Sequence, residues 1–314
     1  MNRVLRNTLL LITLLLPAAC QVSGQSASRT RSSPTLDVLA VETFVADIAQ
    51  NVAGERLAVG SLVPLGLDPH TFEPTPQDIA RIARSQVLIV NGAGFEEWLQ
   101  EVLDNAGGER LVIEAAAGLA MREPGESEEV HAEEEEEHEG DPHFWLDPNQ
   151  VKGYVANIRD GLSRADPGGE TSYAENAAAY IAELEELDAW IAGQVEQIPP
   201  ERRLLVTNHE SFGYFADRYG FSIIGTVIPS VSTGSAPSAQ QLADLIEAIK
   251  ARNVQAIFLE TGTNPELAEQ IALETGARVI SDLFTHSVSP PDGIAPTYID
   301  MMKYNTRTIV DALK

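Results

Sequence analysis

Four of the six histidines in this 314-residue sequence lie in segments that follow expected strands. They are His70 in LDPHTF, His143 in DPHFWL, His209 in TNHESF and His286 in FTHSVS. In open parallel α/β sheets, ligands bind beyond the carboxyl ends of the strands. Imidazole is the commonest metal-binding side chain, and four imidazoles, or three imidazoles and a carboxylate, form a tetrahedral set that suits Zn²⁺. The positions therefore predict one metal site that takes two histidines from each half of the chain.

Two of these histidines occur in the tripeptide Asp-Pro-His, at Asp68 to His70 and at Asp141 to His143. Proline fixes the backbone φ angle just before the histidine. The tripeptide is compatible with a simple turn. It is equally compatible with a pre-oriented ligand whose ring N–H donates to the nearby aspartate. The sequence leaves both interpretations open.

The other two histidines, His131 and His138, lie inside an acidic run in which Glu126 to Glu139 holds nine glutamates. The formal net charge of the whole chain is -26, which argues against nucleic acid as a partner and allows an attraction for cations. The run would raise the local cation concentration, with weak metal binding at its two histidines. Alternatively, it is only a solvated acidic loop.

The N-terminus has the pattern of a targeting segment. Basic residues precede the apolar run Leu9 to Leu16, and two alanines then precede Cys20, the only cysteine. The stretch LLPAAC resembles a bacterial lipobox, so we expect a signal peptide over 1–20 and lipidation of Cys20. An ordinary signal peptide cut near this cysteine is the alternative. Residues 21–34 are expected to form a flexible tether.

Short apolar segments alternate with helical patterns, as is typical of parallel βα units. Strands are expected at 36–41, 57–63, 87–90, 111–113, 203–207, 221–227, 255–259 and 277–281. Helices are expected at 44–53, 76–84, 95–105, 210–219, 238–251, 264–275 and 296–313.

Between the two halves, apolar residues recur at helical spacing from Gly169 to Ile198, before Pro199 and Pro200. The predicted class is therefore α/β, with two lobes that each contain a small parallel sheet flanked by helices. One long rigid helix within 166–199 joins them. The lobes are expected at 35–165, with an acidic loop at 122–142, and at 200–314.

Several motifs together resemble those of the metal-binding substrate-binding proteins of bacterial ABC transporters for zinc and manganese. The motifs are LVPLGLDPHTFEPTPQDI, VNGAGFEEWL, DPHFWLDP, NHESFGYFADRYG and PTYIDMMKYN, and the resemblance extends over residues 36–314. It implies two α/β lobes joined by a single long helix, with the metal between them. It also implies a monomer outside the cytoplasmic membrane that delivers metal to a permease driven by an ATPase.

The resemblance implies that His70, His143 and His209 are metal ligands. The third family position is histidine in zinc-type members and often glutamate in manganese-type members. The fourth is usually an aspartate, but here His286 occupies that place, and Asp282 remains the alternative. A histidine-bearing charged loop before the second ligand is also typical of the zinc type. Because Mn²⁺ prefers oxygen donors, we expect Zn²⁺ as the transported ligand, with Mn²⁺ or iron as the alternative.

Two other classes of function compete with metal carriage. One is a zinc hydrolase with Glu210 as general base, although the chain has no HExxH motif. Four protein ligands would also close the site to substrate. The other is a surface adhesin that binds metal only incidentally. We therefore expect a binding protein and not an enzyme.

Overall fold

The computed structural model describes residues 36–122 and 140–314. The expected signal peptide, the tether and Cys20 lie outside the described residues, as does most of the acidic loop with His131 and His138. No helix in the described ranges is long and apolar enough to cross a membrane.

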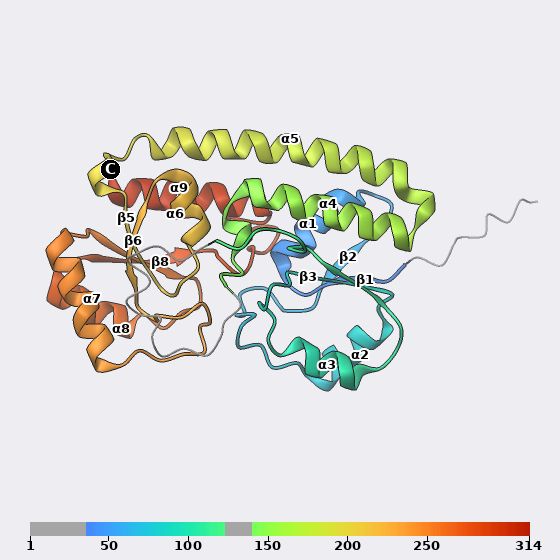
Figure 1. Ribbon diagram of the computed structural model, residues 1–314, viewed down its shortest axis with the longest axis horizontal. Coiled ribbons are helices and arrows are strands. Elements are labelled where there is room, and N and C mark those ends of the chain that lie inside the picture. Colours follow the sequence, from blue (N-terminus) through green and yellow to red (C-terminus); the bar gives the residue numbers. More distant parts are fainter. Residues whose placement is uncertain (1–35, 123–139) are drawn as a thin grey trace, which may run out of the picture. The chain divides into compact units, whose positions relative to one another are not determined.

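Two four-stranded parallel sheets organise the described chain (Figure 1). The first has the order β2-β1-β3-β4 and consists of β1 (Val38–Ala40), β2 (Val59–Ser61), β3 (Val87–Val90) and β4 (Leu111–Glu114). The second has the order β6-β5-β7-β8 and consists of β5 (Leu204–Thr207), β6 (Ser222–Thr226), β7 (Ala256–Glu260) and β8 (Arg278–Leu283). All eight strands fall on expected segments, and the α/β class with two lobes is confirmed.

Helices follow the strands as the alternation predicts. They are α1 (Thr43–Ala53), α2 (Pro76–Arg84), α3 (Leu99–Ala106), α4 (Pro148–Ala165), α5 (Glu170–Val195), α6 (Gly213–Tyr219), α7 (Ala239–Arg252), α8 (Glu266–Thr275) and α9 (Tyr298–Leu313). Helix α2 begins with Pro76 at its first turn, after a capping box between Thr75 and Asp78. Helix α4, of 18 residues, was not among the expected elements.

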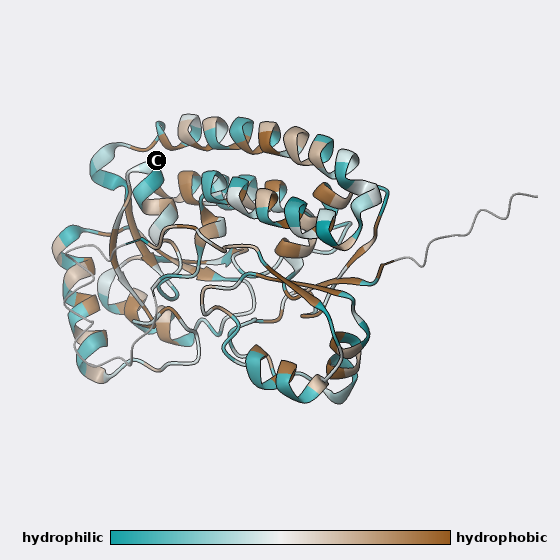
Figure 2. Cartoon of the chain, turned by 45° about the vertical axis from the view of Figure 1, so that its right-hand side comes forward, coloured by the Kyte–Doolittle hydropathy of each residue, from teal (hydrophilic) through white to brown (hydrophobic). Residues whose placement is uncertain are grey.

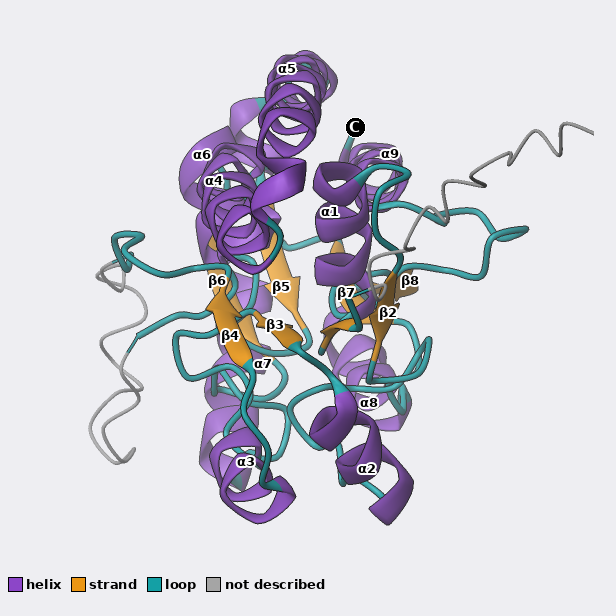
Figure 3. Ribbon diagram, turned by 90° about the vertical axis from the view of Figure 1, so that its right-hand side faces the viewer, coloured by secondary structure: helices purple, strands orange, loops and turns teal. Residues whose placement is uncertain are grey.

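The helices form two layers, one on each side of the sheets (Figure 3). Helices α2 and α3 cover one face of the first sheet, and α7 and α8 cover the corresponding face of the second. The opposite faces are covered by α1, α4, α6 and α9, whose apolar residues form one continuous core with α5. Hydrophobic residues accordingly concentrate on the strands and on the inward sides of the helices (Figure 2).

Helix α5 lies within the segment expected to link the lobes. Its 26 residues span about 39 Å at the usual rise of an α-helix. It packs on α1 and α4 of the first lobe and on α6 and α9 of the second. Its buried residues are Tyr173, Ala177, Tyr180, Leu184, Leu187, Ile191 and Val195. The two lobes therefore share a core, and sliding one past the other would expose apolar surface to water.

Candidate metal centre

The structure brings the four predicted histidines together at the carboxyl ends of the two sheets. One ring nitrogen from each of His70, His143, His209 and His286 lies within 4.8 Å of those of the other three. The last three residues are buried, and His70 is half-buried. Asp282, the alternative fourth ligand, is exposed on β8 and lies outside this group.

Local contacts fix the loops that carry these histidines. The indole Nε1 of Trp98 donates to the carbonyl oxygen of Pro69 at 2.9 Å, which holds the chain just before His70. The hydroxyl of Thr207, at the end of β5, donates to the carbonyl oxygen of His209 at 2.9 Å. These contacts attach the turns to their lobes, as a preorganised site requires.

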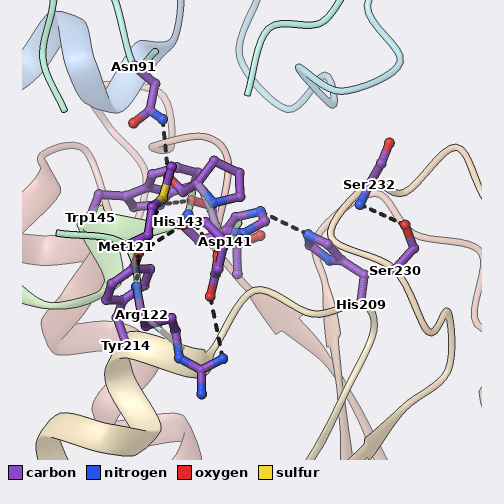
Figure 4. Close-up of polar contacts among 12 residues, drawn as sticks. Asn91, Met121, Arg122, Asp141, His143, Trp145, His209, Tyr214, Ser230 and Ser232 are labelled. Carbon is purple, nitrogen blue, oxygen red and sulfur yellow. Dashed lines mark hydrogen bonds and ion pairs between the residues drawn. The ribbon is translucent and has the colours of Figure 1, made fainter. Parts of the chain in front are cut away.

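Two pairs of Nε2 atoms lie close together. Nε2 of His143 lies 3.3 Å from Nε2 of His70 and 3.2 Å from Nε2 of His209, and the His143 and His209 rings point toward one another in Figure 4. Zinc–nitrogen bonds of about 2.0–2.1 Å in a tetrahedron put ligand nitrogens about 3.3 Å apart. These two spacings therefore match those between ligands in a tetrahedral zinc site.

Carboxylates lie behind three of the rings. Oδ1 of Asp141 is 2.8 Å from Nδ1 of His143 and also accepts the backbone N–H of His143 at 2.9 Å. Oε1 of Glu260 is 2.7 Å from Nδ1 of His209, and its Oε2 is 3.3 Å from Nδ1 of His286. The Asp141 carboxylate is hydrogen-bonded to the outer nitrogen of its ring, and Glu260 lies within ion-pair distance of the outer nitrogens of His209 and His286, so all three rings can offer Nε2 to a metal. Sequence reasoning missed Glu260, whose only signal is its place at the end of β7.

The two aspartates of the DPH tripeptides have different roles. Asp141 contacts the imidazole ring of its own histidine, as the pre-oriented ligand interpretation predicts. Asp68 instead accepts the backbone N–H of His70 at 3.0 Å and the hydroxyl of Thr233 from the second lobe. A cavity of about 410 Å³ lies beside this contact and is lined by Asp68, Thr233, Glu260 and His286, among others.

The environment keeps most of the imidazoles neutral. Burial lowers the pKa of His70, His143 and His286, and neighbouring histidines lower it further. Burial also acts to lower the pKa of His209, but the Glu260 carboxylate outweighs burial and raises it. Burial alone would raise the pKa of Glu260, yet His209 and His286 hold it at about 2. Neutral imidazole is the form that binds metals.

Nε2 of His286 is one of the buried nitrogens that have no hydrogen-bond partner among the described residues, as is Nδ1 of His209. An unsatisfied buried polar atom is unfavourable in a folded protein, and a metal held among the four histidines would satisfy Nε2 of His286. Apolar rings surround the site. The Phe95 ring centroid is 4.6 Å from that of His70, and the Trp145 centroid is 5.1 Å from that of His143.

Glu210, the candidate general base, is not in the histidine group. It is half-buried, and its backbone N–H donates to the carbonyl oxygen of Ser230 at 2.9 Å. The arrangement therefore offers four nitrogen donors, and a cation bound by all four would have no open tetrahedral position for a substrate.

Comparison with known proteins gives matches over nearly the whole described chain. The family described as zinc-uptake complex component A, periplasmic (ZnuA), matches residues 38–312. The chain is 32% identical over 313 residues to the manganese-binding lipoprotein MntA of Halalkalibacterium halodurans, covering 100% of this chain and 99% of that protein. It is 28% identical over 307 residues to the iron ABC transporter substrate-binding lipoprotein MtsA of Streptococcus pyogenes, covering 96% of each.

Solved structures have the same fold. The Mn-bound periplasmic metal binding protein of Candidatus Liberibacter asiaticus superposes with a TM-score of 0.77 at 27% identity, covering 89% of this chain and 100% of that chain. The periplasmic zinc binding protein TroA of Treponema pallidum superposes with a TM-score of 0.78 at 27% identity, covering 89% and 99%. Both likenesses extend across the two lobes described above.

Proposed function

Since the chain belongs to the ZnuA family of periplasmic zinc-uptake components, we propose that it is the extracytoplasmic zinc-binding component of an ABC metal importer. It is a substrate-binding protein of metal transport and not an enzyme. In this proposal, Zn²⁺ is captured between lobe 35–165 and lobe 200–314, which segment 166–199 joins. The monomer then delivers it to a permease driven by an ATPase.

The observation that carries the zinc assignment is the grouping of four imidazole nitrogens within 4.8 Å of one another, with two Nε2 pairs at tetrahedral spacing. We propose His70, His143, His209 and His286 as the ligands. Nitrogen donors in a tetrahedral set suit Zn²⁺, whereas Mn²⁺ prefers oxygen ligands and higher coordination numbers. The Glu260 carboxylate contributes negative charge behind the ligands without replacing one of them.

A second candidate cargo is manganese or iron. The names of the relatives favour it, because MntA is described as manganese-binding and MtsA as an iron transporter component. One of the similar structures also holds Mn. The same fold and importer role apply to either cargo, so the donor set is what supports the proposal of zinc.

Competition between the metals tests the assignment. We expect Zn²⁺ to displace Mn²⁺ and to bind tighter by orders of magnitude, following both the imidazole preference and the Irving–Williams order. Zinc should also raise the melting temperature, because a ligand at 100 times its Kd stabilises the native state by about 2.7 kcal/mol. Titration with a competing chelator, for both metals in one buffer, measures the ratio. Manganese binding equal to or tighter than zinc binding would contradict the zinc assignment.

We also propose that the mature protein is held at the membrane by lipid on Cys20. The relatives MntA and MtsA are named lipoproteins, and Cys20 ends the expected signal peptide. The variant Cys20→Ser should appear in the soluble fraction after cell fractionation, because the thioether-linked lipid cannot form. Membrane association of Cys20→Ser equal to that of the wild type would show that another element anchors the chain.

A further inference from the structure

The two proposed ligands of the second lobe share one carboxylate. Glu260 ends β7, and its side chain is 8% exposed. Its two oxygens lie 2.7 Å from Nδ1 of His209 and 3.3 Å from Nδ1 of His286. We propose that Glu260 is a shared positioning residue that fixes both histidines together, so that the second lobe presents a preassembled half of the metal site. This inference rests on the proposed function.

The chemistry of the carboxylate explains why it can serve two rings. Each carboxylate oxygen can accept a hydrogen bond, so one carboxylate can serve both rings. In the structure, Nδ1 of His209 and Oε1 of Glu260 lie at ion-pair distance without hydrogen-bond geometry. Protonation at Nδ1 leaves Nε2 as the free lone pair of each ring. Nε2 of His209 lies 3.2 Å from Nε2 of His143, and Nε2 of His286 has no hydrogen-bond partner among the described residues. One side chain thereby selects the metal-binding tautomer and the orientation of two ligands.

The first lobe is arranged differently. His143 has its own carboxylate, Asp141, at 2.8 Å from Nδ1. His70 is held through its backbone N–H by Asp68. Loss of Asp141 should therefore affect one ligand ring, whereas loss of Glu260 should affect two. This difference makes Asp141→Asn a matched control for Glu260→Gln.

A glutamine at position 260 keeps the shape of the side chain but not its function. Its amide accepts hydrogen bonds at only one of its two ends, so only one of His209 and His286 can keep its Nδ1–H partner. Loss of an outer-shell carboxylate typically weakens metal binding roughly 10- to 100-fold. We expect Glu260→Gln to weaken zinc binding toward the upper end of that range and Asp141→Asn toward the lower end.

Cobalt reports the geometry directly, because tetrahedral Co²⁺ absorbs visible light far more strongly than octahedral Co²⁺. The Co²⁺-loaded Glu260→Gln protein should lose visible absorption relative to the wild type. Melting curves of each metal-free variant identify any variant that has failed to fold. Glu260→Asp is a second variant, which retains the carboxylate. A role in positioning predicts partial recovery of affinity and spectrum in Glu260→Asp.

A double-mutant cycle shows whether Glu260 acts through its proposed partners. In the His286→Ala background, the zinc affinity lost on Glu260→Gln should be several-fold smaller, because one of the two positioned rings is already absent. Unchanged affinity and Co²⁺ absorption in Glu260→Gln would overturn the proposal, as would equal losses in both backgrounds. If wild-type protein bound manganese in preference to zinc, the zinc assignment would fail. The same cycle measured with manganese would still test Glu260.

Discussion

Replacing His143 with alanine is expected to weaken zinc binding by roughly 100- to 1,000-fold. Structural zinc sites have apparent binding free energies of about 10–16 kcal/mol, which gives about 2.5–4 kcal/mol for each of four ligands. Each 1.4 kcal/mol or so corresponds to a tenfold change in Kd. His143 is central to the group, because its Nε2 lies within 3.3 Å of the Nε2 atoms of two other histidines. Chelator-competition titration measures the loss.

Deletion of Glu126 to Glu139 is the control for this variant. It removes nine glutamates and two histidines that lie outside the described residues, but none of the proposed ligands. Tight zinc binding at the four proposed ligands should survive. Any additional zinc ions that bind weakly to the acidic run should no longer be detected. The association rate should fall, most at low ionic strength, because charge steering is strongest there. If the deletion abolished tight binding and His143→Ala retained it, the metal would be bound by the acidic loop.

The strands were predictable because each is a short apolar run between helical segments. Helix α4 was missed, although Val151, Tyr154, Val155, Ile158 and Leu162 form a buried face at helical spacing. Glycines inside the segment lower its helix propensity. The packing requires one of them, because a Cβ added to Gly161 would lie 2.3 Å from Cδ1 of Ile113 on β4. The feature that weakens the local helix signal therefore permits the close contact between helix and sheet.

The four histidines were predictable because their positions relative to strand ends can be counted along the chain. Glu260 was not, since nothing local distinguishes it from any acidic residue at the end of a buried strand. Its importance comes from the neighbouring strands β5 and β8, which place His209 and His286 on either side of it. A residue that contacts the outer nitrogen of a metal-binding histidine is identified by the tertiary structure and not by a sequence motif.

Trp145→Ala is expected to lower the free energy of unfolding by about 3–5 kcal/mol. The reason is a set of contacts that only the folded protein creates. The side chain is fully buried, and its ring centroid lies 4.3 Å from that of Phe44 and 4.9 Å from that of Phe95. Its indole Nε1 donates to the carbonyl oxygen of Thr285 in the second lobe at 2.8 Å. The hydroxyl of Tyr298 donates to its backbone carbonyl at 2.7 Å. Trp145 therefore connects the lobes beside the histidine group.

Urea unfolding of the metal-free protein measures this cost, and Trp190→Ala is the matched control. Trp190 is half-buried on α5, with the guanidinium of Arg307 5.2 Å from its ring centroid, so its truncation should cost less. The loss of unfolding free energy for Trp145→Phe should lie between those of the two alanine variants. Phenylalanine keeps an aromatic ring, but it leaves the Thr285 carbonyl without its donor, which costs about 1–3 kcal/mol. Equal losses for Trp145→Ala and Trp190→Ala would mean that the core between the lobes does not dominate stability. A larger loss at Trp145 is the result expected if the aromatic core beside the histidine group contributes more to stability than the half-buried ring on α5.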